Sequence, residues 1–578
     1  MRLDLFLPRA KEPKALHKMF RAMGPTWLAS PIRRGAQTAC LIAFVVLFFY
    51  VCWPYTSEHE QDSALLLPHA EFFLLLDPLL SISAALAARV WVWSLAAAAA
   101  VFLVGVVLPR WFCGYICPLG TIIDVFDWLV SGRVTRFRAG REGWWIHLRY
   151  YVLAVVLAAA AGGVLLSGFV AAIAVLTRGM LFLFGPVQMG LLKGWYLVPA
   201  MNAGHYVSIV LFLIVLGLGL LRPRFWCAYG CPTGALLSIG NLLRLTERKV
   251  EARCVECGRC LAACSFDAIG PDYSTRALNC TFCQVCGGVC PSHSIKFAGR
   301  WNNAGLKPAD SRAGPQPSFS RRGFLFGTIG ALGGGAAAGA ALTRERAGYA
   351  ESFPIRPPGS LPERGFRQQC VRCGECFKVC PNNVLQPAGF ELGLDGLWTP
   401  KVVPDWAGCR PSCNNCGHVC PTGAIRALPL EEKLAARMGL AEVNKKTCLP
   451  YAGREDCRIC VDECAAAGYN AVEFVRVGGE VDDQGVPIEG SGYLAPVVLE
   501  DKCVGCGLCQ TSCHSINVKG KKLLNHSAVV VSAGPGKEDR IIAGSYRDLR
   551  AERRSRTKQP QPSQPKGSGD NYLPDFLL

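Results

Sequence analysis

The stretch Cys254-Val-Glu-Cys257-Gly-Arg-Cys260-Leu-Ala-Ala-Cys264 decides the fold of the residues around it, because its spacing is that of a metal-cluster loop. Bacterial ferredoxins wrap a [4Fe–4S] cluster with three cysteines spaced in this way and give the fourth to a neighbouring cluster. A second such run begins at Cys280. We therefore predict an α+β, ferredoxin-like dicluster domain over residues 246–300. Its two ligand sets are Cys254, Cys257, Cys260 and Cys290, and Cys280, Cys283, Cys286 and Cys264.

Four further runs lie in a polar, loop-rich region, residues 346–550, which we expect to form a second ferredoxin-like domain. One run has an extra residue, one opens with a gap of eight residues after Cys448, and the last is followed by His514 rather than proline. All ligands are present, so we expect four clusters here and six in the chain. The pairing of these runs stays open, and the long gap could instead mark a cluster of altered type. The predicted ligands are Cys370, Cys373, Cys376, Cys380, Cys409, Cys413, Cys416, Cys420, Cys448, Cys457, Cys460, Cys464, Cys503, Cys506, Cys509 and Cys513.

Other uses of the 30 cysteines fit this spacing less well. A disulfide framework shows irregular spacing and usually belongs to a short secreted chain. Structural zinc normally takes two Cys-x-x-Cys pairs separated by a long gap. No Cys-x-x-Cys-His occurs, so we expect no covalent haem. No Walker loop and no dinucleotide loop after a strand occurs either, so we expect no nucleotide.

Much of the remaining sequence is apolar enough for a membrane. The chain is 51% hydrophobic and carries a formal net charge of +18. Its Lys and Arg residues gather beside apolar stretches rather than on a polar, aromatic-bearing face, so we expect membrane lipid and not nucleic acid as a partner. A helix needs about 20 apolar residues to cross the bilayer. We predict a four-span α-helical membrane domain over residues 35–245, with spans at 36–54, 84–108, 146–168 and 204–221.

The flanking charges predict the orientation of these spans. The N-terminal segment, residues 1–34, is basic, and further arginines follow the second and fourth spans. The stretch between the first two spans is acidic and has no Lys or Arg before Arg89. Lys and Arg collect on the cytoplasmic side of membranes. We therefore expect a protein of the bacterial inner membrane whose N-terminus and first ferredoxin domain are cytoplasmic.

A second signal separates the two groups of cysteine runs. The segment Ser320-Arg-Arg-Gly-Phe-Leu325 precedes an apolar stretch and closely fits the twin-arginine signal for export of folded proteins. Export after folding suits cluster proteins, because an unfolded chain would expose its thiolates to oxidation outside the cytoplasm. We expect the twin-arginine translocase as a partner. The predicted segments are a linker over 301–319, a fifth, signal-anchor helix over 320–345, a periplasmic region after about 343 and a disordered tail over 551–578.

The membrane domain repeats internally. Leu108-Pro-Arg-Trp-Phe-Cys113-Gly-Tyr-Ile-Cys117-Pro-Leu-Gly ends the second span, and Arg222-Pro-Arg-Phe-Trp-Cys227-Ala-Tyr-Gly-Cys231-Pro-Thr-Gly ends the fourth. Each repeat would hold two spans and an apolar segment that does not span, 65–82 in one and 171–188 in the other. Because thiols four residues apart share a helix face, the two Cys-x-x-x-Cys-Pro segments would place four thiols at one inner interface. These thiols would ligate a metal centre, bind Cu(I), form redox disulfides or simply pack helix ends.

Ionisable residues in apolar stretches are candidates for function, because the bilayer makes them costly. A site that oxidises quinol needs proton acceptors beside an apolar slot. We name Asp77, Arg178, His147 and His205 as candidate catalytic residues of such a site. For each of them, an interfacial or internally satisfied side chain is the alternative.

Two parts of the chain resemble known proteins. Residues 1–300 resemble NapH, the polytopic ferredoxin of the periplasmic nitrate reductase system, in their four expected spans, two Cys-x-x-x-Cys-Pro segments and dicluster domain. Residues 318–520 resemble NapG, its exported four-cluster partner, and the methylamine-utilisation ferredoxins. The stretch Cys448-Leu-Pro-Tyr-Ala-Gly-Arg-Glu-Asp-Cys457-Arg-Ile-Cys460 is particularly similar to that group.

The resemblance implies a natural fusion that acts as a quinol dehydrogenase and passes electrons from the quinone pool to a periplasmic cytochrome or reductase. No Ser-Gly-Ala-Thr flavin-attachment motif occurs, so we expect no flavin. The alternative is a maturation or metal-handling factor, resembling the Cys-x-x-x-Cys-Pro ferredoxins that serve oxidase assembly and copper reduction. In that case the Cys-x-x-x-Cys-Pro thiols would bind or reduce copper, and the clusters would only supply electrons.

Overall fold

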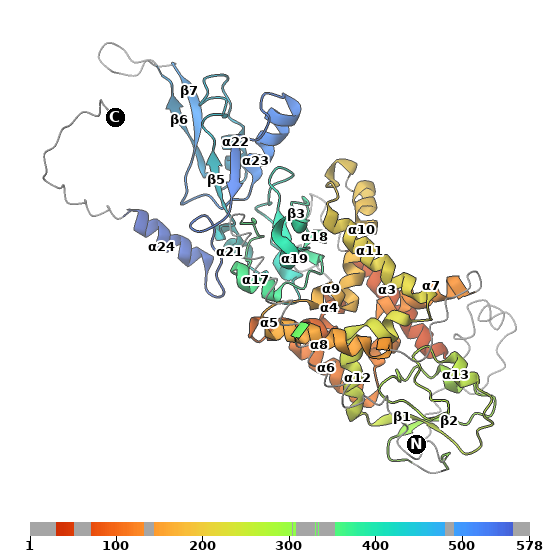
Figure 1. Cartoon of the computed structure of the whole chain (residues 1–578). Coiled ribbons are helices and arrows are strands. Elements are labelled where there is room, and N and C mark those ends of the chain that lie inside the picture. Colours follow the sequence, from red (N-terminus) through yellow and green to blue (C-terminus); the bar gives the residue numbers. More distant parts are fainter. Residues whose placement is uncertain are drawn as a thin grey trace, which may run out of the picture.

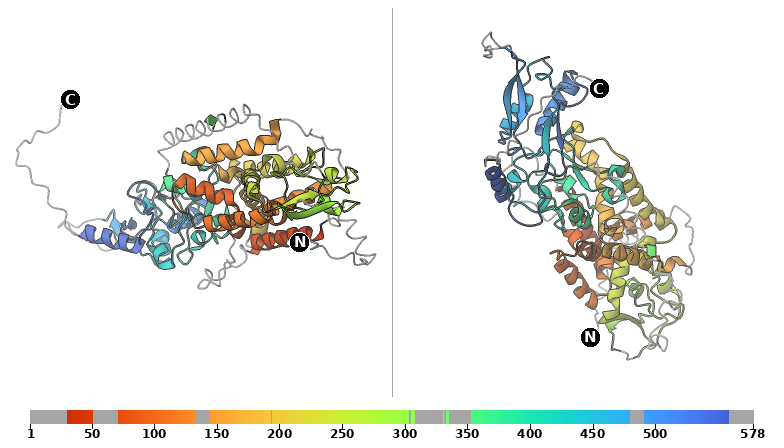
Figure 2. Two further views of the ribbon diagram at one scale, coloured as in Figure 1. Left: turned by 90° about the horizontal axis from the view of Figure 1, so that it is seen from below. Right: turned by 60° about the vertical axis from the view of Figure 1, so that its left-hand side comes forward.

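The computed structural model describes residues 30–50, 71–131, 144–192, 194–302, 305–307, 330, 333–334, 353–479 and 491–558. A helical body lies in the middle of the molecule, with a cysteine-rich lobe at each end (Figure 1). Figure 2 shows the same arrangement from two further sides. We call residues 244–302 the inner lobe and residues 353–558 the outer lobe. Most of the predicted linker, twin-arginine signal and fifth helix lies outside the described residues, as does the predicted tail after 558.

The helical body consists of apolar helices, whose side chains suit both a packed interior and a lipid-facing surface. Among the described residues, three helices are long and apolar enough to cross a membrane: Pro31–Tyr50, Ala172–Leu192 and Ala203–Leu220. They indicate that the protein is associated with a membrane. The longer helices are α3 (Pro31–Tyr50), α6 (Leu95–Val107), α7 (Pro118–Ser131), α8 (Leu148–Ala161), α10 (Ala172–Leu192) and α11 (Ala203–Gly217).

The helical body departs from the expected spans in three places. The expected span 146–168 is shorter, because α8 ends at Ala161 and a separate helix, α9 (Ser167–Val170), follows. The stretch 84–108 is interrupted, because α5 (Pro78–Ala88) ends at Arg89, which adopts a left-handed conformation with φ of 56°, before α6 starts. The segment 171–188, expected not to span, forms α10 with 21 residues, about 30 Å of helix. Arg178 lowers the hydropathy of this segment, but its side chain is hydrogen-bonded inside the protein. The four-span repeat stays a prediction.

Short elements connect the longer helices of the body. They include π-helical turns, η1 and η5, at the two Cys-x-x-x-Cys-Pro segments. Such turns are rare and often occur at functional sites. The short elements are α4 (Phe72–Leu75), η1 (Phe112–Ile116), η2 (Trp144–His147), α9 (Ser167–Val170), η3 (Trp195–Leu197), η4 (Leu218–Leu220), η5 (Trp226–Gly230), α12 (Pro232–Gly240) and η6 (Asn241–Leu243).

The inner lobe has the small α+β layout of a ferredoxin. Strands β1 (Thr246–Val250) and β2 (Ile295–Gly299) pair antiparallel and bring the two ends of the lobe together. Both cysteine runs lie between them. The third cysteine of each run sits on a short helix, α13 (Arg259–Ala263) or α14 (Val285–Gly288).

The outer lobe repeats this layout on a larger scale. Its strands form two-stranded antiparallel sheets, β3 with β4, β5 with β8, and β6 with β7. The pairing of β5 with β8 encloses the last two cysteine runs. The elements are α17 (Glu363–Gln369), α18 (Glu375–Lys378), β3 (Leu385–Pro387), η7 (Phe390–Leu392), α19 (Gly393–Gly396), β4 (Pro400–Val402), α20 (Asn415–His418), α21 (Leu430–Ala435), β5 (Leu440–Val443), α22 (Ile459–Ala466), β6 (Val472–Val477), β7 (Tyr493–Val498), α23 (Leu508–Cys513), η8 (His514–Gly520), β8 (Val529–Ser532) and α24 (Tyr546–Lys558).

The outer lobe docks on the helical body through its first cysteine run. Gly168 of α9 approaches this run so closely that a Cβ there would lie 2.3 Å from the carbonyl oxygen of Val371. The indole of Trp398 is buried in the junction and donates a hydrogen bond to the carbonyl of Gly204, at the start of α11, over 2.7 Å. One continuous hydrophobic core therefore includes residues of both the helical body and the outer lobe.

Candidate functional site

The inner lobe brings together the cysteines that the spacing paired. Cys260 interacts electrostatically with Cys254 and Cys290. Cys264 interacts in the same way with Cys280 and with Cys283. The fourth cysteine of each run thus lies beside the other run, which is the crossed arrangement of a two-cluster ferredoxin.

The cysteine loops have glycines at backbone positions that need positive φ for the loop to wrap a cluster. Gly258, Gly374 and Gly507 precede the short helix that carries the third cysteine of their runs, with φ of 73°, 88° and 85°. Glycine adopts positive φ without steric cost. The buried guanidinium of Arg248 lies beside sulfurs of both inner sets, and its Nε has no hydrogen-bond partner among the described residues. A cation placed in this way fits anionic clusters, which supply one-electron redox chemistry when bound.

The outer lobe pairs its runs in the same crossed way, which the spacing alone left open. The first two runs exchange their fourth cysteines, because Cys373 interacts with Cys420 and Cys413 interacts with Cys380. The last two runs do the same. The run with the long gap therefore contributes its first three thiols to one set, as the regular runs do. The four sets are Cys370, Cys373, Cys376 and Cys420; Cys409, Cys413, Cys416 and Cys380; Cys503, Cys506, Cys509 and Cys464; and Cys448, Cys457, Cys460 and Cys513.

In each outer set, one run supplies three of the four thiols, and we name the set after the first cysteine of that run. The four sets follow one another away from the helical body. Thr177 Oγ1 of α10 donates to the carbonyl of Cys373 over 3.2 Å, so the Cys370 set lies at the junction. The backbone N–H of Cys409 donates to the carbonyl of Cys506 over 2.8 Å, which joins the Cys409 set to the Cys503 set. Cys509 of the Cys503 set interacts electrostatically with Cys460, which adds the Cys448 set at the end of this order. Helices α22 and α23, which carry thiols of both of these sets, pack together at the end of the outer lobe away from the helical body (Figure 1).

The Cys448 set has a neighbour that sequence reasoning missed. Asn517 is buried in η8, and its Nδ2 lies 3.7 Å from Cys457 Sγ and 3.8 Å from Cys513 Sγ. Hydrogen bonds to ligand sulfurs are one of the influences that set the reduction potential of a cluster. A sign of this neighbour in the sequence is His514, which stands where the first two outer runs have proline. Without a proline there, the helical backbone continues to Asn517.

The two Cys-x-x-x-Cys-Pro segments fold alike and meet inside the helical body. In each, a π-helical turn is followed by a proline that begins the next helix, α7 or α12. The contacts between the segments are reciprocal: Arg110 donates to the carbonyl of Cys227 over 3.4 Å, and Arg224 donates to the carbonyl of Cys113 over 3.3 Å. The structure thereby brings together the four thiols, which we call the quartet: Cys113, Cys117, Cys227 and Cys231.

The four candidate quinol-site residues do not converge on one place. His205 lines a pocket at the junction with the outer lobe. Asp77 is buried at the start of α5, where it accepts hydrogen bonds from Thr233 Oγ1 over 3.0 Å and from the backbone N–H of Leu79. His147 ends η2, which packs against η5 near the quartet. Asp77 and His147 are therefore structural neighbours of the quartet rather than of the pocket.

Arg178 lies at the junction but does not line the pocket. Its guanidinium is fully buried, donates to Ser208 Oγ over 3.0 Å and to the carbonyl of Arg372 over 3.0 Å, and lies 3.7 Å from the ring centroid of Trp398. These contacts tie α10 and α11 to the first cysteine run. Arg178 thus holds the Cys370 set against the helical body.

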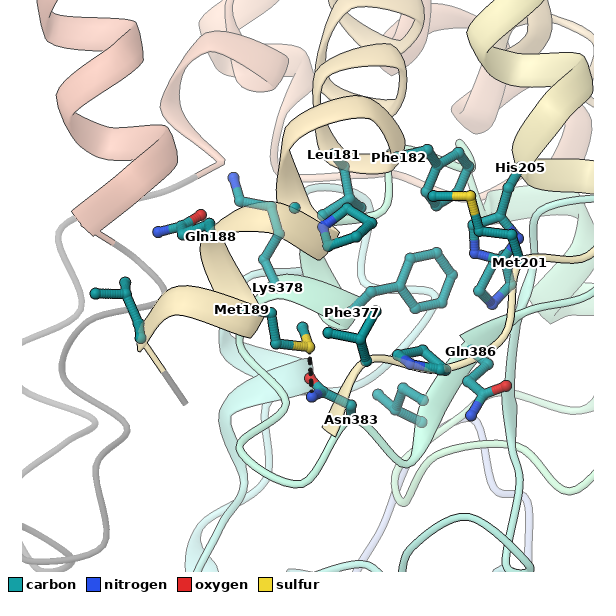
Figure 3. Close-up of a pocket in the computed structure, with 17 residues that line it drawn as sticks. Leu181, Phe182, Gln188, Met189, Met201, His205, Phe377, Lys378, Asn383 and Gln386 are labelled. Carbon is teal, nitrogen blue, oxygen red and sulfur yellow. Dashed lines mark hydrogen bonds between the residues drawn. The ribbon is translucent and has the colours of Figure 1, made fainter. Parts of the chain in front are cut away.

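The pocket lies between α10, α11 and the segment 377–387 of the outer lobe (Figure 3). Its empty volume is about 760 Å³, open solvent included. The ring of His205 packs on Phe182 with 4.5 Å between centroids, and its Nδ1 is bonded to the backbone N–H of Asn202 over 3.0 Å, which leaves Nε2 for a ligand. The walls are mostly apolar: Leu181, Phe182, Pro186, Met189, Leu192, Val198, Pro199, Met201, Phe377, Leu385 and Pro387.

The outer lobe supplies pocket residues that the sequence could not identify. Lys378, Asn383 and Gln386 line the pocket, and they follow the third cysteine of the first outer run. Lys378 Nζ is bonded to the buried carboxylate of Glu375 over 2.9 Å. Asn383 Nδ2 donates to the carbonyl of Leu197 over 3.1 Å. No local pattern marks these residues, because their place depends on docking between segments almost 200 positions apart.

Two family models for 4Fe-4S binding domains match parts of the chain. A family model described as a 4Fe-4S binding domain (Fer4_5) matches residues 90–136, 204–250 and 416–430, and the first two matches each contain one Cys-x-x-x-Cys-Pro segment. A second model with the same description (Fer4) matches residues 367–386. No solved structure matches the chain.

Curated relatives match the chain over most of their own length. The methylamine utilization ferredoxin-type protein MauM of Methylorubrum extorquens is 38% identical over 203 residues, 34% of this chain and 85% of the relative. The ferredoxin-type protein NapG of Escherichia coli is 34% identical over 202 residues, 34% of this chain and 83% of the relative. The ferredoxin-type protein NapH of Haemophilus influenzae is 28% identical over 314 residues, 51% of this chain and 99% of the relative. The chain belongs to the iron–sulfur, electron-transferring ferredoxin-type family of MauM and NapG, and it joins a NapG-like part to a NapH-like part in one polypeptide.

Proposed function

We propose that this protein is a membrane-bound quinol dehydrogenase, which takes electrons from the quinone pool and delivers them through the outer lobe to a periplasmic cytochrome or reductase. The observation that carries the proposal is the pocket beside His205. It opens between apolar helices of the body and is closed on the other side by residues of the first outer cysteine run. A substrate from the lipid phase would thus reach the edge of the Cys370 set.

The pocket has the chemistry that a quinol requires. Its mostly apolar walls accept a ring and the start of an isoprenoid tail. Oxidation of a quinol to a quinone releases two electrons and two protons. His205 is the hydrogen-bonding group for one quinol hydroxyl, because Asn202 fixes its ring and Nε2 remains open. The amide of Gln386 and the side chain of Lys378 are further polar groups that line the pocket.

The order of the cysteine sets supports an outward path. The Cys370 set lies nearest the pocket, and the Cys448 set is farthest from it. We propose the corresponding topology, with the inner lobe in the cytoplasm, the outer lobe exported through the twin-arginine translocase into the periplasm, and the helical body in the bacterial inner membrane. An acceptor would then meet the outer lobe near the Cys448 set.

A substitution that fills the pocket tests the proposal. We expect Met201→Trp to slow reduction of the clusters by a short-tailed quinol analogue, while reduction by dithionite stays as in the wild type. The matched control is Met438→Leu, a buried methionine of the outer lobe that does not line the pocket. Cluster reduction is followed by EPR on anaerobic protein. Equal rates of quinol-driven reduction in Met201→Trp and wild type would sink the assignment of this pocket.

A further inference from the structure

The quartet of thiols lies in the part of the helical body that quinol oxidation at the outer pocket does not use. We propose that Cys113, Cys117, Cys227 and Cys231 hold an iron–sulfur cluster with four thiolate ligands, between the inner lobe and the outer lobe. The inference concerns a different site from the pocket and does not depend on which substrate supplies the electrons.

The local structure presents the thiols as ligands. Each Cys-x-x-x-Cys-Pro segment ends at the start of a helix, so the second cysteine lies at a helix N-terminus, where an anionic sulfur is favoured. The backbone N–H of Gly234 donates to Cys231 Sγ over 3.4 Å. A Cβ at Gly234 would lie 2.9 Å from Arg110 Nη2 and 3.7 Å from Cys231 Cβ, so this glycine leaves room where thiol and guanidinium meet. Cys117 interacts electrostatically with the other three thiols.

Two buried arginines lie beside the quartet without a carboxylate among their described hydrogen-bond partners. Arg110 and Arg149 are buried, with 1% and 2% of their surface exposed. Their guanidiniums donate only to neutral groups among the described residues, including the carbonyls of Cys227 and Ala228 and the side chain of Asn279. The Nε of each has no hydrogen-bond partner in the described part of the chain. Burying unpaired cations is costly, and a tetrathiolate iron–sulfur cluster supplies negative charge beside them.

This balance distinguishes a cluster from the other uses of the thiols. A disulfide is neutral and would leave both guanidiniums without a counter-charge. A single Cu(I) or Zn²⁺ needs its ligands drawn tightly around one point. Within the described residues, no three His, Cys, Asp or Glu side chains are close enough to hold a single metal ion. The same is true of the six ferredoxin sets.

Residues that follow Cys231 in the chain make hydrogen bonds toward both neighbouring groups of ligands. Toward the inner lobe, Asn241 Nδ2 donates to the carbonyl of Cys280 over 3.1 Å. Toward the outer lobe, Thr233 donates to Asp77, which also accepts a hydrogen bond from the backbone of Ile173 in α10. One helical turn later, Thr177 of α10 donates to Cys373 of the first outer set. A cluster on the quartet would therefore link the two lobes through the body.

Iron and acid-labile sulfide, counted per chain on anaerobically purified full-length protein, test the proposal. We expect the double variant Cys117→Ala/Cys231→Ala to lose about four iron atoms and four sulfides for a cubane, or about two of each for a [2Fe–2S] cluster. The matched control is Cys40→Ala, a cysteine of α3 outside the quartet, which should leave both counts unchanged. An iron count equal to the wild type in the double variant would overturn the proposal, as would loss of bound copper or zinc in place of iron.

If the double variant does not fold and cannot be purified, a milder substitution tests the same proposal. Cys117→Ser replaces one thiolate by a hydroxyl that can still ligate iron. We expect this variant to keep the outer and inner ferredoxin signals but to change one component of the Mössbauer and EPR spectra. Spectra identical to the wild type would contradict a cluster on the quartet. Neither measurement uses quinol, so failure of quinol oxidation would leave both results standing.

Discussion

The junction between the helical body and the outer lobe depends on the absence of a side chain at Gly168. A methyl group added by Gly168→Ala would lie 2.3 Å from the carbonyl oxygen of Val371, whereas real Cβ contacts are essentially never under 3.0 Å. The difference, 3.0 − 2.3, means that the two backbones must separate by at least 0.7 Å. The obstacle is backbone rather than a flexible side chain, so the outer lobe itself has to move.

The free energy that this displacement costs can be estimated from substitutions that overpack a protein core. Extra methyl groups in such places usually cost about 1–3 kcal/mol. If that energy falls on the docked state, the ratio of docked to undocked molecules drops by about 5- to 150-fold, since about 1.4 kcal/mol corresponds to a factor of ten. The substitution replaces no cluster-binding thiol, so we expect cluster content to stay as in the wild type.

Hydrogen exchange and electron transfer measure the two consequences. Amides in peptides that cover 366–374 and 165–178 should exchange faster in Gly168→Ala, and quinol-driven reduction of the outer sets should slow. The control is Gly105→Ala, also in an apolar helix, where an added Cβ meets nothing within 4 Å. Unchanged exchange at the junction together with an unchanged rate in Gly168→Ala would refute the docking described here.

Three further predictions concern single side chains. Burial would raise the pKa of Glu363, but Arg356 and two other arginines outweigh it and hold that pKa well below its usual range. The ionised Glu363 therefore stabilises the folded protein above about pH 4.3, and this stabilisation is lost as the pH falls. Glu363→Gln should lower stability by about 3 kcal/mol at neutral pH and flatten the acid limb of a thermal-melt series, and an unchanged limb would contradict the ion-pair reading. Asn517→Leu should shift one cluster to a lower midpoint potential in an EPR redox titration. The control Asn415→Leu should not, because the buried Asn415 side chain has no hydrogen bond to sulfur among the described contacts. His205→Ala should slow reduction by quinol at least tenfold, a loss of about 1.4 kcal/mol in transition-state stabilisation, and equal rates would remove His205 from the site.

The ligand sets were predictable because their information is local. The crossed sets of the inner lobe follow from the spacing around Cys254 and Cys280, and a ferredoxin loop tolerates little variation in that spacing. The extra residues at Cys409 and Cys448 left the outer pairing open, because insertions in a loop can change which thiols converge. The structure shows that the same crossed scheme accommodates both insertions.

The pocket was only partly predictable, because it is made by docking. His205 was recognisable as an ionisable residue in an apolar stretch, but Lys378 and Gln386 carry no local sign of their role. Arg178 was recognised for the same reason as His205, yet its hydrogen bonds to the first outer run show that it serves the junction. The internal repeat led us to expect a segment that does not span at 171–188, whereas α10 is long and apolar enough to cross a membrane.

Whether electrons from quinol reach the outer lobe is decided by freeze-quench EPR on the anaerobic full-length protein after mixing with a quinol analogue. We predict that signals of reduced [4Fe–4S] clusters rise within the turnover time and come from the outer lobe. Disruption of the Cys370 set by Cys373→Ala should abolish reduction of the remaining outer sets by quinol, while dithionite still reduces them. Absence of any cluster reduction by quinol, or unchanged reduction of the distant sets in Cys373→Ala, would contradict the proposed path.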